Sequence, residues 1–229
     1  MDYLEVLDGM KGEMLETLQD LIRIDSVQTP EVKGEDGAVY PFGKGIQNAY
    51  EYTLKAGRDM GFETVNYDNY GGHIELKGED PEHSETFGIT VHLDEVPVGE
   101  GWETDPFDPI VKDGWIYGRG TSDDKGPTVA ALYAMKAIKE SGLPLKKNVR
   151  MIVGLDEETE KNGMIYYKEH ADKLPELGIT PDGDFPVVQG EMGILVFDIV
   201  RKLSGGRKYD GLALKSLKSG VAYNLVSPE

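Results

Sequence analysis

The sequence predicts an α/β fold, because segments with a helical pattern alternate with short apolar segments along the chain. Apolar residues recur at spacings of three and four over residues 3–22 and again over 127–141, as on the buried face of an amphipathic helix. Residues 149–155 form a near-continuous apolar run of strand length, and residues 87–93 resemble a second buried strand. In such a fold, a ligand site lies at the carboxyl ends of the strands.

The expected elements follow one another from the N-terminus to residue 200, with no internal repeat and no low-complexity tract. Residues 29–44 contain Gly and Pro and are expected to form a loop, and residues 68–72 form a turn between two strands. We expect helices at 3–22, 46–60, 127–141 and 164–174, and strands at 62–67, 73–77, 87–93, 115–117, 149–155, 187–188 and 194–200.

The composition excludes several kinds of partner and site. The chain has 229 residues, of which 24 are Lys or Arg and 42 are Asp or Glu, so its formal net charge is -18. This charge would repel nucleic acid and anionic lipid, and we expect neither as a partner. Without cysteine there is no disulfide and no thiolate ligand, so any metal must be held by His and carboxylate groups. No signal peptide or membrane span is apparent, and a cytoplasmic protein fits best.

Four short segments just past expected strands carry His or carboxylate groups that can bind metal, and two of them follow the buried strands. His92 and Asp94 are two residues apart and point the same way if the strand continues, so Asp94 can be the carboxylate partner of a ligating His92. Asp156, Glu157 and Glu158 cap the strongest apolar strand; adjacent carboxylates can divide the roles of metal ligand and proton acceptor. Taken alone, both segments also fit a histidine at a strand end and solvated acidic turns.

Residues 118–127 form a glycine-rich, acidic loop just before an expected helix. In such a loop the backbone can approach a cation while Asp123 reaches it, although an Asp near a helix N-terminus also has a purely structural explanation. The spacing matches neither a P-loop nor a dinucleotide fingerprint. Asp182, in a Pro-Asp-Gly sequence, is by itself ordinary turn chemistry. We expect His73, His83 and His170 to be structural or surface residues.

These segments belong to a longer ordered series. The series consists of His92–Pro97, Gly101–Trp102, Asp105–Phe107, Asp113–Gly120, Asp123–Gly126 and Asp156–Glu158, followed by Pro181–Asp182, Phe185–Pro186 and Gly190–Gly193. In this order it resembles the aminoacylase, carboxypeptidase G and peptidase V family of di-zinc hydrolases. The last three motifs are similar to those of the peptidase V and carnosinase-like branch, which cleaves dipeptides.

The resemblance implies a fold and a set of roles. The fold would be a zinc-exopeptidase-like three-layer domain with a mostly parallel central sheet. His92 and Asp182 would bind the first of two zinc ions, Asp123 would bridge both, and Glu158 would bind the second. Glu157 would be the general base in zinc-dependent hydrolysis of a dipeptide or short peptide, with Asp94 as the partner of His92. The resemblance also implies a cis peptide bond between Asp123 and Asp124.

The sequence departs from the family in its C-terminal part. The second histidine ligand and the lid histidine of the family have no counterpart, and residues 220–229 resemble the point where the family's chain enters its lid domain. We therefore expect an incomplete catalytic domain at 1–200, a truncated start of the lid at 201–229, and one tight zinc site. A related deacylase or desuccinylase and a non-catalytic metal-binding fragment remain alternatives. The sequence does not define the oligomeric state.

Overall fold

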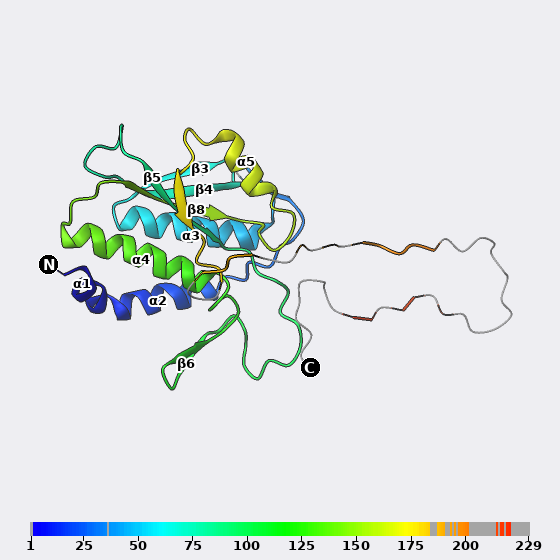
Figure 1. Cartoon of the computed structure of the whole chain (residues 1–229). Helices are drawn as coiled ribbons and strands as arrows, with labels where there is room; N and C mark the ends of the chain where they lie inside the picture. The colour runs from blue at the N-terminus through cyan, green and yellow to red at the C-terminus, as the bar shows by residue number, and fades with distance from the viewer. Residues whose placement is uncertain are drawn as a thin grey trace.

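A computed structural model describes residues 2–35, 37–183, 187–190 and 197–201, together with residues 193, 195, 214, 216, 217, 219 and 220. Its helices and strands form three layers, with a central sheet that has several helices on one face and a single described helix on the other (Figure 1). The α/β class expected from the alternation of helical and strand patterns is confirmed.

The central sheet has five strands in the order β3-β4-β8-β5-β9. Their bounds are Glu63–Tyr67 for β3, Gly71–Leu76 for β4, Thr86–His92 for β5, Asn148–Gly154 for β8 and Leu177–Ile179 for β9. β5 pairs in parallel with both β8 and β9, whereas β4 pairs antiparallel with β3 and β8. The described sheet is therefore mixed rather than mostly parallel, because the hairpin β3–β4 reverses the chain within a short turn.

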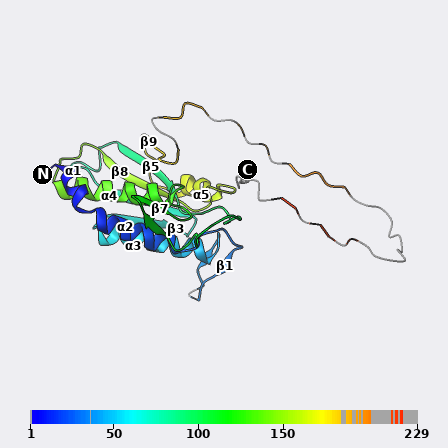
Figure 2. The ribbon, with the colours of Figure 1, turned by 90° about the horizontal axis from the view of Figure 1, so that it is seen from below.

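Helices cover both faces of this sheet. The helices are α1 (Tyr3–Gly9), α2 (Lys11–Ile22), α3 (Lys44–Asp59), α4 (Lys125–Ser141) and α5 (Asn162–His170). On one face, Ile74 of β4 packs against Gly57 of α3; on the other, His73 contacts Tyr167 of α5. Successive residues of a strand point to opposite faces, so these two contacts define the two sides. α1 and α2 lie on the side of α3 and α4, nearest the viewer in Figure 2.

The core lies between the sheet and the helices α3 and α4. Its strand residues alternate with residues of the opposite face, as Ile89 and Val91 do on β5 and Met151 and Val153 do on β8. Burying a side chain of this size stabilises the fold by about 1.5–3 kcal/mol relative to leaving it exposed. The core therefore fixes the central strands, whose ends carry the polar residues described below.

Two small antiparallel sheets lie outside the core. β1 (Val32–Lys33) pairs with β2 (Val39–Tyr40), and β6 (Ile110–Lys112) pairs with β7 (Trp115–Tyr117). The strand expected at residues 115–117 is confirmed, while its partner β6 and the two-residue strands were not expected. The β6–β7 hairpin projects from the layered part of the molecule in Figure 1.

The expected helices differ from the observed ones at two places. The first helix breaks at Met10, whose N–H bonds to the carbonyl of Leu7 at 3.0 Å, so α1 and α2 are separate. α5 ends at His170 rather than continuing to residue 174. The reason is a tertiary contact, because Arg150 on β8 binds the carbonyl of Lys173 at 2.6 Å and holds this segment in a non-helical path.

The strands observed near the C-terminus differ from the strands expected there. The structure forms β9 at residues 177–179, where no strand was expected, and its central residue Gly178 gives it no apolar alternation. Val187 and Val188 are not in a strand, and neither are the described residues of the expected strand 194–200. The rest of that segment and most of residues 201–229 lie outside the described residues.

None of the helices in the described part of the chain combines the length and the apolar character that crossing a membrane requires.

Candidate metal centre

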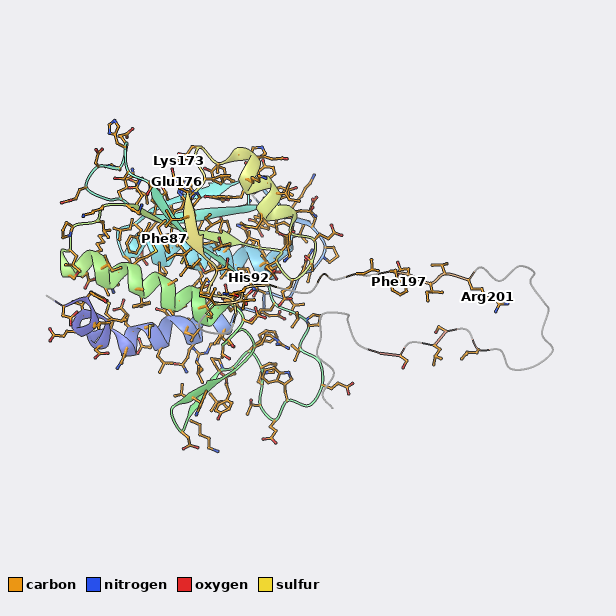
Figure 3. The ribbon with its side chains drawn as sticks, viewed as in Figure 1. Phe87, His92, Lys173, Glu176, Phe197 and Arg201 are labelled. Carbon is orange, nitrogen blue, oxygen red and sulfur yellow. The ribbon has the colours of Figure 1, made fainter. Side chains whose placement is uncertain are left out.

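Three neighbouring parallel strands end at one edge of the sheet. β5 ends at His92, β8 ends at Gly154, and β9 ends at Ile179, three residues before Asp182. Because the strands run in parallel, the segments that follow them meet at the same edge. Figure 3 shows His92 at this edge, away from Lys173 and Glu176 near the opposite end of β5.

His92, Asp123 and Asp182 converge at this edge. The Nε2 atom of His92 lies 3.0 Å from Oδ1 of Asp123 and 3.4 Å from Oδ2 of Asp182. One ligand atom from each residue lies within 4.8 Å of the others, so the three groups could hold a single metal ion. The structure thus brings together three of the four metal ligands named from the sequence.

The orientation of the His92 ring suits metal binding. Its Nδ1 lies 3.1 Å from the carbonyl oxygen of Asp94, and because a carbonyl oxygen only accepts, Nδ1 must carry the proton. In the neutral ring Nε2 is then the atom with the lone pair; it is buried and makes no hydrogen bond to any described residue. A buried ring nitrogen directed at two carboxylates fits a cation between them.

The charged groups around His92 also favour a cation at this position. Burial alone would lower the pKa of His92, but the carboxylates of Asp123, Asp182 and Asp94 raise it above its ordinary value. Contact with His92 in turn lowers the pKa of Asp182. The cluster therefore favours a positive charge at the His92 ring, which a bound metal ion would supply in place of a proton.

Asp94 contacts both His92 and the loop after β8. Its buried carboxylate lies 3.3 Å from Nδ1 of His92 and accepts the N–H groups of Glu157 and Glu158 at 3.0 and 2.8 Å. The sequence predicted the first of these contacts. The second, which fixes the loop that carries both glutamates, was missed because backbone donors leave no sequence signal.

Glu157 and Glu158 lie in different surroundings. Glu157 is half-buried, and its Oε1 forms an ion pair with Nζ of Lys161 at 2.5 Å. Burial raises the pKa of Glu158 to about 7, and the negative charge of Asp123 is the second largest cause of this rise. Glu158 lies outside the compact three-residue cluster.

Two further carboxylates that were not assigned a role shape this edge. The Asp123–Asp124 peptide bond is cis, as expected. The buried Asp124 accepts the N–H of His92 at 3.0 Å, and burial raises its pKa to about 7. Asp156 accepts the N–H groups of Asn162 and Gly163 at 2.6 and 2.9 Å and so anchors the start of α5. Their burial distinguishes them from Asp123, and burial is not visible in an acidic sequence.

The remaining histidines lie away from the cluster. His73 is buried, with Nδ1 2.9 Å from the hydroxyl of Tyr167, whereas His83 and His170 are exposed. The expectation that all three are structural or surface residues is confirmed.

The cluster of His92, Asp123 and Asp182 is accessible, because a cavity of about 990 Å³ between α2, α4 and the strands β5 and β9 includes Asp123 and Asp182 in its wall.

Comparison with known proteins gives consistent matches. The sequence profile of Peptidase family M20/M25/M40 matches residues 88–203. The chain is 38% identical over 217 residues to "Putative dipeptidase YtjP" of Bacillus subtilis and 39% identical over 218 residues to "Putative dipeptidase SSP1012" of Staphylococcus saprophyticus. Each match covers 94% of this chain and 45% of the relative, so the chain spans about half the length of these relatives.

Solved structures share the fold. Human carnosine dipeptidase 1 superposes with a TM-score of 0.58 at 25% identity, over 73% of this chain and 37% of that one. The dipeptidase Dug1p of Saccharomyces cerevisiae superposes with a TM-score of 0.61 at 19% identity, over 74% of this chain and 37% of that one. At the lower identity the likeness concerns the fold alone.

Proposed function

Because the chain belongs to peptidase family M20/M25/M40, as its motifs predicted, we propose that it carries the metal site of a zinc-dependent dipeptidase. One observation carries this proposal. The buried Nε2 of His92 has no hydrogen-bond partner among the described residues and faces the carboxylates of Asp123 and Asp182. The names of the relatives and of carnosine dipeptidase 1 support a dipeptide or another short peptide as the substrate.

The proposed ligands divide into a complete and an incomplete set. His92, Asp123 and Asp182, with a water molecule, make the four ligands that zinc prefers. Asp123 and Glu158 would hold a second zinc ion with only two side chains from this chain. We therefore expect one tightly bound and one weakly bound zinc ion. Zinc bound here would polarise the scissile carbonyl and acidify the attacking water.

The chain's own residues then have separate tasks. Glu157 accepts the proton of the attacking water and donates it to the leaving amine. To do so its carboxylate must exchange the ammonium of Lys161 for water, and the exposed position of the Lys161 side chain makes that exchange easy. Asp94 holds the His92 ring in the orientation that presents Nε2 and keeps Glu157 and Glu158 at the site through their backbone N–H groups.

The proposal includes a domain division. Residues 1–200 would form part of the catalytic domain, and residues 201–229 would form the start of a second, lid domain. In support, every helix and strand of the described residues lies between Tyr3 and Ile179. A deacylase or desuccinylase would use the same ligands, and the names of the relatives favour the dipeptidase.

The test is to load the purified chain with zinc, count bound zinc per chain by elemental analysis, and assay hydrolysis of a dipeptide series. We expect one zinc ion that survives dialysis, and its loss in Asp123→Asn and Asp182→Asn. His170→Ala, which removes an exposed histidine, is the matched control and should keep the metal. Equal zinc retention by all three variants and the unaltered chain would refute the site. Hydrolysis of acylated or succinylated amino acids in preference to dipeptides would favour the alternative enzyme.

A further inference from the structure

A buried ion pair lies beneath the loop that carries Asp123. The Nζ atom of Lys125 is 3.0 Å from Oε1 of Glu95, and both side chains are 0% exposed. Lys125 begins α4 and follows Asp123 by two residues, while Glu95 follows His92 by three. A buried ion pair is seldom worth more to stability than apolar side chains of the same volume, so another role should be sought for it.

The pair joins three segments of the chain. Nζ of Lys125 donates to the carbonyl of Ile24 at 2.8 Å, which connects α4 to the segment after α2. Oε2 of Glu95 accepts the backbone N–H of Ser26 at 3.3 Å and its hydroxyl at 3.0 Å. The N–H of Glu95 donates to the carbonyl of Ser26 at 3.2 Å. The start of α4, the end of β5 and the segment after α2 are thus connected through two charged groups.

The loop before α4 packs directly on this pair. Gly120 has a φ of +81°, and a Cβ atom at this position would lie 2.4 Å from Oε1 of Glu95 and 3.0 Å from Cδ of Lys125. Only glycine allows both this backbone conformation and this close approach. The position of residues 118–124 relative to the end of β5 therefore depends on where the Glu95 carboxylate lies.

From these contacts we infer that Glu95 is a positioning residue of the metal centre. Through its ion pair with Lys125 and its packing against Gly120, it sets the distance between Asp123, on the loop, and His92, at the end of β5. This inference rests on the proposed function, because it assigns Glu95 to the site that His92, Asp123 and Asp182 form. Among the described residues, Glu95 forms no ion pair or hydrogen bond with His92, Asp123 or Asp182.

The experiment compares zinc affinity with stability in the full 229-residue chain. Zinc affinity is measured by competition with a fluorescent chelator, and the free energy of unfolding by urea denaturation without metal. Glu95→Gln should weaken zinc binding about 10- to 100-fold, the usual effect of losing a group that positions a ligand. Glu95→Asp keeps the charge but withdraws the carboxylate by one methylene, and should also weaken zinc binding while the protein stays folded.

Two controls separate positioning from stability. Glu75→Gln breaks another largely buried ion pair, between Glu75 and Arg150 at 3.1 Å, away from the site, and should lower stability without changing zinc affinity. In the double variant Glu95→Gln/Lys125→Met no buried charge is left unpaired, so stability should recover. Zinc affinity should stay low, because the directed contacts remain absent.

Three results would overturn the inference. The first is a zinc affinity of Glu95→Asp and Glu95→Gln equal to that of the unaltered chain. The second is an equal loss of affinity in Glu75→Gln, and the third is recovery of affinity together with stability in the double variant. If instead the unaltered chain binds zinc no better than Asp123→Asn, the proposed metal site itself fails, and the positioning role fails with it.

Discussion

Acid should destabilise the fold through His73, a residue remote from the metal centre. His73 is 3% exposed, and burial, with the nearby charge of Arg150, lowers its pKa from 6.5 to about 4, although Asp172 and Glu63 oppose this effect. The unfolded chain therefore binds a proton at a higher pH than the folded chain. The stabilisation that the neutral ring provides is complete above pH 6.5 and is lost as the pH falls towards 4.

The size of the effect follows from the two pKa values. One pKa unit corresponds to about 1.4 kcal/mol, and between pH 7 and pH 5 the linkage amounts to about 2 kcal/mol of unfolding free energy. In His73→Gln the amide can keep a hydrogen bond to the Tyr167 hydroxyl, at 2.9 Å from Nδ1 in the native protein, but it does not titrate. Between pH 7 and pH 5 the variant should therefore lose about 2 kcal/mol less stability than the unaltered chain.

Urea denaturation at several pH values between 5 and 7, without metal, measures this difference. His83→Gln, which removes a histidine from the surface, controls for the loss of a histidine as such. The comparison uses the slope of stability against pH rather than its value at one pH, so a constant cost of the substitution cancels. Parallel slopes for His73→Gln and the unaltered chain would show that the buried ring takes up its proton in the folded state, and would refute the reasoning.

Three further predictions concern the carboxylates at the edge of the sheet. Asp94→Asn should weaken zinc retention about 10- to 100-fold in chelator competition, because the amide is a poorer partner for His92 and can accept only one of the two N–H groups, of Glu157 and Glu158, that the carboxylate accepts. In the whole protein, Glu157→Gln should keep zinc but lower turnover of a dipeptide by about 10²-fold or more. Glu158→Ala should instead lower the zinc content. Loss of zinc in Glu157→Gln and loss of turnover alone in Glu158→Ala would exchange the two roles. Asp156→Ala should cost about 1–3 kcal/mol in urea denaturation by leaving the N–H groups of Asn162 and Gly163 without their acceptor, and an unchanged midpoint would contradict this.

The sequence predicts those elements that local pattern determines. The helix at 127–141 and the strand at 149–155 appear within two residues of the expected bounds, because each has an apolar face long enough to show its period. β9 has three residues with a glycine at its centre, and only its pairing with β5 makes it a strand. α5 stops early because of Arg150, a residue of β8. Both differences arise from contacts between distant segments, which a local pattern does not contain.

The same distinction applies to the metal centre. His92, Asp123 and Asp182 could be named from the sequence as proposed ligands only through the ordered series of motifs, because Asp182 by itself is ordinary turn chemistry. The residues that hold them in place look ordinary in a chain with 42 Asp and Glu residues. Glu95 and Lys125 are 30 positions apart, and nothing in their neighbours indicates that both are buried and paired. The proposed ligands can thus be named from the sequence, whereas the structure is needed to find the residues that pack around them.

The mixed sheet explains why His92, Glu158 and Asp182 follow its three parallel strands and why no proposed ligand follows β3 or β4. β8, β5 and β9 are parallel, so the segments after His92, Gly154 and Ile179 meet at one edge, and Asp123 joins them from the loop before α4. β3 and β4 lie on the side of β8 away from β5 and form an antiparallel hairpin. The short turn between them, at residues 68–70, only reverses the chain. The antiparallel half therefore supports the parallel half by packing, and its buried polar residue, His73, is free to serve stability rather than metal binding. On this argument, substitutions in β3 and β4 should change zinc affinity only in so far as they unfold the protein, whereas substitutions just beyond the ends of β5, β8 and β9 should change it in the folded state.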